Sequence, residues 1–258
     1  MGLGMARAMA RDGIDVKGFD IRPAGEFGDF ADRMAPDIWD FAADRHVILS
    51  VVRDIAQTEE LLFDDQAVLS RAPELRYLVI CSTLSPRYFA DLASRLPGGV
   101  ALIDAPMSGA QVAADEARLS FMLGGDQSQI DELKPIFYAM GQHIHHMGAT
   151  GAGMTAKVLN NFVAASSVTA TRQALDWADD LGLDPAKLMA LMHDSSGQTW
   201  FGSNFDRIEF ARDGCNPANT LGILKKDVES CLDAIDPAQH AGLPQAIVDA
   251  VAALKPRG

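Results

Sequence analysis

The chain has 258 residues, of which 48% are hydrophobic and 22% are charged, and these proportions exclude an intrinsically disordered protein. The length allows a large buried core and favours two domains. The formal net charge is −13, with no lysine- or arginine-rich run. Such a surface repels phosphate backbones, so we expect no nucleic-acid partner.

Cysteine usage and hydropathy favour a cytoplasmic protein. The three cysteines, Cys81, Cys215 and Cys231, are far apart and form no CxxC pair, which favours a reducing compartment. No apolar run reaches the ~20 residues that a membrane-spanning helix needs. The first residues lack the basic head and apolar stretch of a signal peptide. We therefore expect no membrane partner.

The first residues resemble the second half of a dinucleotide-binding unit. Gly2–Arg11 predicts a helix, and Ile14–Asp20 alternates like a strand that ends in an acid. Gly2 precedes Asp20 by close to the ~20 residues expected between a glycine loop and the acid that binds the adenosine ribose. We interpret Gly2 as the third glycine of a G-x-G-x-x-G motif whose beginning is missing.

Asp20 and Arg22 bear on the choice between NAD and NADP. The Asp20 carboxylate would accept hydrogen bonds from the ribose hydroxyls and repel the 2′-phosphate of NADP. Arg22 would instead bind that phosphate. The alternative for Asp20 is a turn acid before Arg22-Pro23, and these residues alone support both interpretations about equally.

The next segments alternate between buried strands and helices. The predicted strands are His46–Val52, Leu78–Ser82, Val100–Asp104, Leu119–Gly125 and His143–Met147, and Arg87–Arg95 and Gln127–Met140 are predicted helices. This alternation predicts a parallel, doubly wound sheet, in which ligands bind at the carboxyl ends of the strands. Val52, Thr83 and Ser108 each follow a strand, so we expect them to share one cleft.

A histidine triplet in the last strand raises the question of a metal site. Alternation puts His143 and His145 on one face of the strand and His146 on the other. No nearby Asp, Glu or Cys completes a ligand set. We predict no metal.

From Gly153 onward the pattern is helical only. Met154–Leu181 contains neither Gly nor Pro and predicts a helix roughly 40 Å long. Further helices are predicted to start at Asp184-Pro185 and to cover Leu221–Ile235 and Pro244–Leu254. We therefore predict an α/β domain over residues 1–150 and a helical domain over residues 151–258.

The start of that long helix carries the candidate chemistry. Its sequence is Gly-Ala-Gly-Met-Thr-Ala-Lys-Val-Leu-Asn-Asn over residues 151–161. Lys157 and Asn161 are one turn apart and share a helix face. The alternative is a solvated lysine with asparagine spacers, and the spacing alone favours that alternative.

Four segments together resemble the β-hydroxyacid dehydrogenases related to 3-hydroxyisobutyrate dehydrogenase. Asp104-Ala-Pro-Met-Ser-Gly109 resembles the family's D-A-P-x-S-G, and residues 151–161 resemble its G-x-G-x-x-x-K-x-x-x-N. Leu224-Lys-Lys-Asp227 is similar to its L-x-K-D, and Met1–Ala6 to the end of its glycine fingerprint. The order and spacing agree over nearly the whole chain.

The resemblance implies a Rossmann-like domain that binds NAD, with NADP as the alternative, and a long helix leading into a 6-phosphogluconate dehydrogenase-like helical domain. It implies reversible oxidation of a small 3-hydroxy acid to its semialdehyde or keto acid, with Lys157 as general acid/base and Asn161 positioning it. Ser108 and Gly109 would bind the substrate carboxylate. It also implies a homodimer or homotetramer.

The chemistry agrees with these roles. A lysine can take the hydroxyl proton if burial or the positive nicotinamide lowers its pKa from a normal ~10.4. An asparagine oxygen accepts from the ammonium without neutralising it.

Three further side chains are candidates with equally good alternatives. Thr83 and Lys226 would contact the cofactor, but helix capping or solvation explains them as well. Trp200 would line the substrate pocket, but interface packing explains it equally.

The sequence also departs from the family pattern. Ala110, Ala113 and Ala117 stand where glycines are expected, and both ends appear clipped relative to the family. The absence of the first two glycines of the G-x-G-x-x-G motif leaves a second hypothesis open. In this hypothesis the protein is a non-catalytic or cofactor-impaired member of the family that acts as an interaction protein. A third is an enzyme of the same fold that reduces a different carbonyl, such as a semialdehyde. The sequence does not name the substrate.

Overall fold

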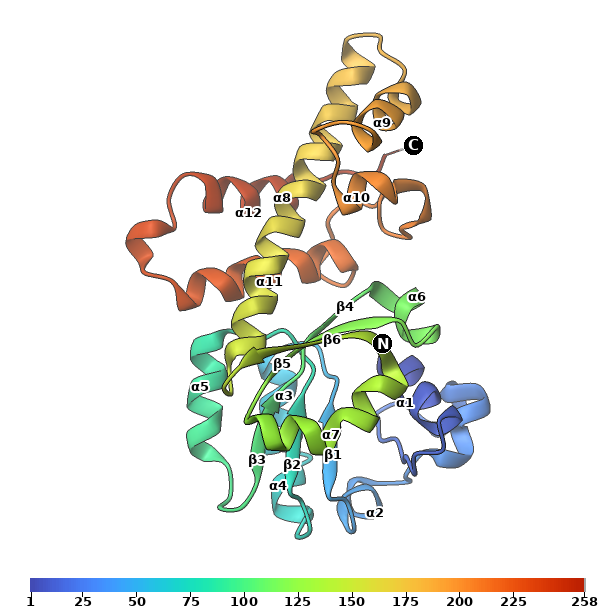
Figure 1. Ribbon diagram of the computed structural model, residues 1–258, viewed down its shortest axis with the longest axis vertical. Coiled ribbons are helices and arrows are strands. Elements are labelled where there is room, and N and C mark those ends of the chain that lie inside the picture. Colours follow the sequence, from blue (N-terminus) through green and yellow to red (C-terminus); the bar gives the residue numbers. More distant parts are fainter. Residues whose placement is uncertain (258) are drawn as a thin grey trace. The chain divides into compact units, whose positions relative to one another are not determined.

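The computed structural model describes residues 1–257, which form two compact units (Figure 1). The first is Met1–Lys157 and the second begins at Val158. The division falls inside one continuous helix, α8 (Ala152–Asp180), whereas the sequence suggested a boundary near Thr150. Within the described part of the chain, no helix combines the length and hydropathy of a membrane span.

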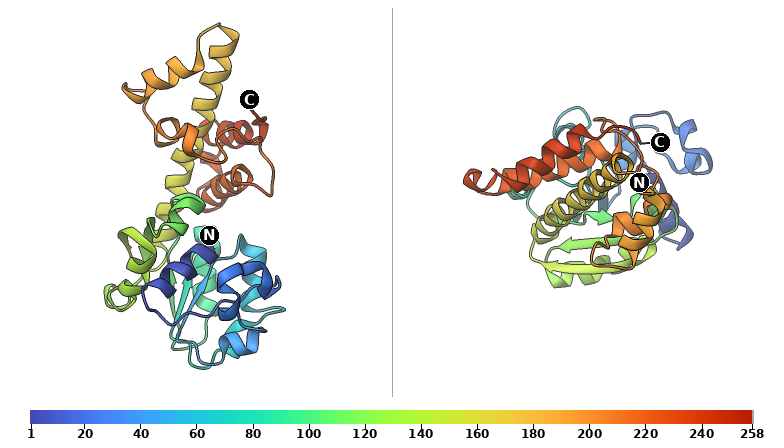
Figure 2. Two further views of the ribbon diagram at one scale, coloured as in Figure 1. Left: turned by 90° about the vertical axis from the view of Figure 1, so that its right-hand side faces the viewer. Right: turned by 90° about the horizontal axis from the view of Figure 1, so that it is seen from above.

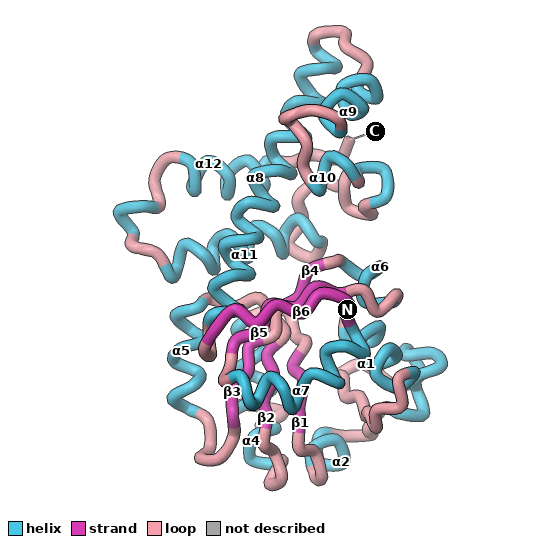
Figure 3. Tube along the Cα trace, viewed as in Figure 1, coloured by secondary structure: helices cyan, strands magenta, loops and turns pink. Residues whose placement is uncertain are grey.

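A six-stranded sheet forms the centre of the first unit (Figure 3). Its strands are β1 (Val47–Ser50), β2 (Tyr77–Ile80), β3 (Ala101–Asp104), β4 (Met107–Ser108), β5 (Leu119–Gly124) and β6 (Gly141–Gly148). Their order is β1-β2-β3-β5-β4, and β6 also pairs with β5. The sheet is mixed rather than parallel, because β5 runs antiparallel to β3 and β4. The short β3–β4 link and the return through α6 (Ala110–Asp115) replace the long crossover that a parallel strand needs.

Helices cover both faces of this sheet, as a doubly wound fold requires. On one face lie α1 (Gly2–Arg11) and α7 (Gln127–Met140), which bury Met5, Met9, Ile130, Leu133 and Phe137 against the strands. On the other lie α2 (Ile38–Ala42), α3 (Ile55–Leu62), α4 (Val68–Arg71) and α5 (Pro86–Arg95). Each fully buried large side chain stabilises the fold by about 1.5–3 kcal/mol. The Rossmann-like α/β class is thereby confirmed.

The predicted strand over Ile14–Asp20 is wrong. In this segment only Gly18 forms a bridge, with Met34, and the adjoining residues Ala24–Arg33 form the 3₁₀ element η1. A strand needs a neighbouring strand to satisfy its N–H and C=O groups along its length. None of the strands that the structure describes pairs with Ile14–Asp20.

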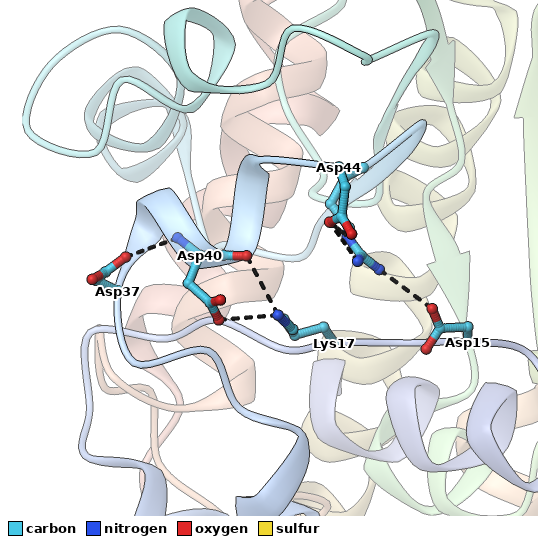
Figure 4. A network of polar contacts seen from close by, with 6 residues as sticks. Asp15, Lys17, Asp37, Asp40 and Asp44 are labelled. Carbon is cyan, nitrogen blue, oxygen red and sulfur yellow. Dashed lines mark hydrogen bonds and ion pairs between the residues drawn. The ribbon is translucent and has the colours of Figure 1, made fainter.

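Side chains hold this segment in place instead (Figure 4). The Lys17 ammonium lies 3.0 Å from the Asp40 carboxylate, and Asp40 donates its backbone N–H to the Asp37 side chain at the start of α2. Arg45 lies between Asp44 and Asp15. Ile14 and Val16 are partly buried and pack on the core, but the alternation of apolar residues does not correspond to strand pairing.

Two of the alanines at expected glycine positions adopt left-handed backbone. Ala110 has φ +60° and Ala117 has φ +53°. A Cβ is strained in this region, which glycine occupies freely. The family's preference for glycine at these positions therefore has a conformational cause.

Replacing Ala117 with glycine is expected to stabilise the protein. Relief of about 1–2 kcal/mol of left-handed strain outweighs the roughly 0.4–1 kcal/mol of extra unfolded-state entropy. Urea unfolding should therefore give a gain of about 0.5–1 kcal/mol. The matched control is Ala170→Gly on the exposed side of α8, which should cost about 1 kcal/mol. Equal losses in both variants would contradict the strain argument.

The second unit is wholly helical (Figure 2). It comprises the rest of α8 with α9 (Pro185–His193), α10 (Trp200–Ser203), η2 (Phe205–Arg207), α11 (Thr220–Ala234), η3 (Pro237–Gln239) and α12 (Leu243–Ala253). Val168 and Leu175 of α8 pack with the aromatic cluster Phe201, Phe205 and Phe210, while α11 and α12 pack beside Ala165. The buried Arg172 donates to the carbonyls of Ala211 and Asp213 and fastens that loop to α8.

Candidate active site

The carboxyl ends of the parallel strands lie at one edge of the sheet. Ser50, Ile80 and Asp104 are the last residues of β1, β2 and β3 and are in register with one another. The Ser82 hydroxyl donates to the Val52 carbonyl at 2.6 Å, so the segments after β1 and β2 lie together. Thr83, the residue after Ser82, is partly exposed at this edge. The structure thus brings Val52 and the Ser82–Thr83 turn into one neighbourhood.

The first turn of α1 also lies at this edge. A Cβ added to Gly2 would lie 3.5 Å from the Val51 Cβ, an ordinary van der Waals contact, so Gly2 lies beside the end of β1. The free N–H groups and dipole of a helix N-terminus favour an anion such as a pyrophosphate. The residues present therefore fit a dinucleotide at this point.

Asp20 is paired with Arg22 in the described structure. Its Oδ1 accepts from the Arg22 backbone N–H at 3.0 Å and from Nε at 3.1 Å, and Oδ2 accepts from Nη2 at 3.1 Å. Partial burial acts to raise the pKa of Asp20, but the hydrogen bonds and charge of Arg22 outweigh it and hold the pKa below its ordinary value. Asp20 is therefore an anion, with lone pairs left for ribose hydroxyls.

Ser108 is the last residue of β4, and Gly109 is the N-cap residue of α6. Ser108 lies opposite Ser120 of β5 and is partly exposed. Gly109 has φ +137°, and a Cβ there would lie 2.4 Å from the Ala113 Cβ. Only glycine fits this position, which explains the glycine of the D-A-P-x-S-G motif. The small Ala113 side chain is part of the same close packing.

Asp104 links two motifs that are far apart in the sequence. Its fully buried carboxylate accepts from the backbone N–H groups of Gly151 at 2.8 Å and Met154 at 2.6 Å, at the start of α8. A Cβ on Gly153 would lie 2.9 Å from this carboxylate and closer still to the Met122 carbonyl. Asp104 therefore caps α8, and Gly153 makes room for it.

Burial gives Asp104 an unusual dependence on pH. Desolvation raises its pKa above the ordinary value, although Gly151 and Met154 donate hydrogen bonds to it. A raised folded-state pKa means that the fold favours the protonated group. Its contribution to stability is full below about pH 3.9 and is lost as the pH rises through the raised pKa.

The variant Asp104→Asn tests the direction of this pH dependence, because an asparagine side chain does not titrate. The free energy of unfolding of the wild type minus that of the variant should shrink as the pH is raised from about 4 towards neutrality. Urea unfolding over this range measures the difference, in which the other acids largely cancel. A difference that grows with pH would show that the folded-state pKa is lowered instead.

Lys157 and Asn161 lie one turn apart on α8, and each is only 7% exposed. Asn161 donates its amide to the Asp227 carboxylate of α11 at 2.6 Å, and Asp227 is itself 3% exposed. The Lys226 ammonium lies 2.6 Å from the other carboxylate oxygen of Asp227. The simple alternative of a solvated lysine at position 157 does not hold, because its side chain is buried.

Trp200 and the histidine triplet, which the sequence also singled out, have ordinary structural surroundings. Trp200 is the first residue of α10 and is 63% exposed. His146 places its ring nitrogens 2.8–2.9 Å from the carbonyls of Gly125 and Gly148 and from the Gln127 side chain, so it acts as a structural tie at the end of β6.

Sequence reasoning assigned no role to Asp104 and Asp227, although both lie in quoted motifs. The available signal was an acid within an otherwise apolar or basic stretch, since buried acids are rare unless they are paired. That signal does not reveal the partner, which is 47 residues away along the chain for Asp104 and 66 for Asp227.

A Rossmann-like unit that has a helix N-terminus at the carboxyl edge of its sheet and is followed by a helical unit is typical of nicotinamide-dinucleotide-binding proteins. Residues 1–148 match the family model described as the NAD binding domain of 6-phosphogluconate dehydrogenase. Residues 151–255 match the NAD-binding domain of NADP-dependent 3-hydroxyisobutyrate dehydrogenase. The chain belongs to the β-hydroxyacid dehydrogenase family.

Individual relatives agree with this placement. The chain is 32% identical over 203 residues to a Pseudomonas aeruginosa 3-hydroxyisobutyrate dehydrogenase, covering 78% of this chain and 68% of that one. It is 28% identical over 222 residues to the human mitochondrial 3-hydroxyisobutyrate dehydrogenase, covering 85% of this chain and 66% of the human protein. The match thus spans slightly less than two thirds of the human protein.

A solved structure extends the likeness to three dimensions. The Mycobacterium tuberculosis 3-hydroxyisobutyrate dehydrogenase with L-serine superposes with a TM-score of 0.78 at 26% identity. The superposition covers 99% of this chain and 92% of that one.

Proposed function

We propose that this protein catalyses the NAD(P)-dependent, reversible oxidation of a small 3-hydroxy acid to its semialdehyde or keto acid. The observation that carries the proposal is the burial of Lys157, with Asn161 buried one turn further along α8. Lysine is almost never this buried without a specific partner or role. A buried amine on the same helix face as Asn161 is where a general base of this reaction would lie.

Each residue has a defined part in the proposed reaction. Lys157, as the neutral amine, takes the proton from the substrate hydroxyl at Nζ and returns it in the reverse direction. Ser108 donates its hydroxyl, and Gly109 its backbone N–H, to the substrate carboxylate. The bound nicotinamide supplies the hydride chemistry. Gly2, Val52 and Thr83 hold the cofactor.

Spectrophotometric NAD⁺ reduction over a panel of 3-hydroxy acids tests the function. The panel includes 3-hydroxyisobutyrate and L-serine, which the names of the relatives supply. Turnover of one or more members is expected. Absence of turnover on every acid, and of the reverse reaction on the matching semialdehydes, would favour the non-catalytic interaction protein. Fluorescence titration with NADH, run in parallel, distinguishes a protein that does not bind the cofactor from one that binds it without catalysing a reaction.

We further propose NAD rather than NADP as the preferred cofactor. The Asp20 anion attracts the ribose hydroxyls and repels a 2′-phosphate, and Arg22 is already committed to Asp20 by two side-chain hydrogen bonds. Fluorescence titration should show tighter binding of NADH than NADPH by about tenfold, or roughly 1.4 kcal/mol. Asp20→Asn should narrow that ratio, while Arg22→Ala should preserve or widen it. Tighter NADPH binding by the wild type would contradict the assignment.

The second unit also supports a homo-oligomer, either a dimer or a tetramer. Leu159, Val163 and Trp177 are exposed apolar residues along α8, and the exposed Leu181 follows directly after this helix. The helix α9 is rich in Leu and Met yet has no buried residue. Exposed apolar patches of this kind are typical of subunit interfaces, and a self-complementary stripe suits a two-fold contact. Light scattering should report an oligomer that Trp177→Glu dissociates, whereas Leu243→Glu, at an exposed position on α12, should not. A monomeric wild type would refute this proposal.

The cysteines support a proposal on location. Cys81, Cys215 and Cys231 are free thiols, as is usual in a reducing compartment, so we propose that the protein acts in the cytoplasm.

A further inference from the structure

The buried polar contact between α8 and α11 determines how Asn161 is oriented. Both residues of this contact belong to the second unit. The Asn161 Nδ2 donates to Asp227 Oδ2 at 2.6 Å, and Lys226 lies against Oδ1 of the same carboxylate. A carboxylate without a proton only accepts hydrogen bonds, so the amide must present its nitrogen to Asp227. The Asn161 Oδ1 is therefore directed away from Asp227.

A second hydrogen bond indicates the same orientation independently. Asn160 donates its side-chain amide to the Asn161 Oδ1 at 3.2 Å. Oxygen and nitrogen of an amide are assigned from such networks, and here donor and acceptor assignments agree on both ends of the group. One carbonyl oxygen is thus fixed on the part of α8 that also carries Lys157 one turn earlier.

We propose that Asp227 is a positioning residue, which holds Asn161 so that its amide oxygen, rather than its nitrogen, serves the Lys157 amine during proton transfer. This inference rests on the proposed function for its consequence, but not for its geometry. If the Asn161 amide were flipped, its N–H groups would face Lys157. After Lys157 has taken the proton it is an ammonium, and two groups of hydrogen-bond donors repel each other. Fixing one of two nearly isosteric orientations is a task that a charged acceptor performs and a neutral amide does not.

Asp227→Asn separates positioning from simple support. The variant keeps the volume and can still bond to Asn161, but its amide both donates and accepts, so Asn161 has two comparable orientations. We expect kcat per folded molecule to fall by about tenfold to a hundredfold, since small errors of placement have effects of that size. Asp227→Glu, which remains an acceptor only, should recover part of the loss.

A matched control removes an equivalent charge from the same helix. Glu229 is exposed on α11 and pairs with Lys225, without contact to Asn161. Glu229→Gln should leave kcat unchanged. If it lowers kcat as much as Asp227→Asn does, the effect is one of charge on α11 and the inference fails.

NMR of the side-chain amides in asparagine-labelled protein detects the hydrogen bond between Asn161 and Asp227 without any assay of activity. The Asn161 signal, identified by its loss in Asn161→Ala, should show a shifted proton that exchanges slowly in the wild type and loses both properties in Asp227→Asn. An unchanged signal overturns the inference, as does a changed signal with kcat unaltered, which would leave Asp227 a purely structural tie. If Asp227→Asn does not fold, two measurements still test the inference. These are the slow exchange of the Asn161 amide proton in the wild type and the partial kcat of Asp227→Glu.

The two proposals fail in different ways. A wild type that turns over no hydroxy acid, while the Asn161 amide shows the expected protection, overturns the proposed function alone. An active wild type whose Asn161 amide exchanges freely overturns the role of Asp227 alone.

Discussion

Replacing Lys157 with alanine is expected to lower kcat by about 10²–10⁴-fold, because the substrate hydroxyl loses its general base. Cofactor binding should persist, since Gly2, Val52 and Thr83 are the proposed cofactor contacts. Steady-state kinetics and NADH titration on the same preparation measure the two effects. Lys157→Arg should be nearly as inactive, because a guanidinium stays protonated and cannot accept the proton.

Lys187→Ala provides the matched control for loss of a lysine. Lys187 is exposed on α9 and its removal should leave turnover unchanged. Because Lys157 is buried, the unfolding midpoint of Lys157→Ala must be measured, so that rates refer to folded protein. A primary amine of small size, added to Lys157→Ala, should restore part of the rate. Full turnover by the alanine variant without added amine would remove Lys157 from the mechanism.

Replacing Asp104 with alanine is expected to reduce the free energy of unfolding by about 3 kcal/mol or more. The change leaves the backbone N–H groups of Gly151 and Met154 without an acceptor in a buried place, and each such loss costs about 1–3 kcal/mol. The start of α8 is then free to move, and it carries Lys157. Turnover should therefore fall further than the population of folded protein does.

The N-cap residue Asp54 of α3, which is partly exposed, provides a comparison for the loss in free energy of unfolding at Asp104. Asp54 caps α3 by accepting from the Gln57 backbone N–H at 3.0 Å, and its removal should cost about 1 kcal/mol. Urea unfolding of both alanine variants compares the two caps directly. Similar losses at Asp104 and Asp54 would show that Asp104 is an ordinary cap rather than the joint between the sheet and α8.

Local sequence signals located most elements of the fold correctly. The predicted helix over Arg87–Arg95 lies within α5, which begins at Pro86 and is capped by the Ser85 hydroxyl accepting from Arg87 and Tyr88. The predicted helices over Gly2–Arg11 and Gln127–Met140 coincide with α1 and α7. Periodicity and caps act over one or two turns, so a single segment contains the information they carry.

Signals that depend on a distant neighbour were read less well. The alternation in Ile14–Asp20 predicted a strand, but whether such a segment becomes a strand depends on whether another strand lies beside it. The direction of β5 relative to β3 likewise followed from the short path through β4, which apolar runs do not reveal.

For the candidate site, the sequence by itself determined which residues are present and that Lys157 and Asn161 share a helix face, because helical spacing fixes that relation. Only the tertiary structure decided that the Lys157 side chain is buried, that Asp104 caps α8 and that Asp227 fixes the amide of Asn161. Burial and hydrogen bonding are properties of pairs of segments brought together by folding, and a carboxylate's partner is chosen by that packing rather than by its neighbours along the chain.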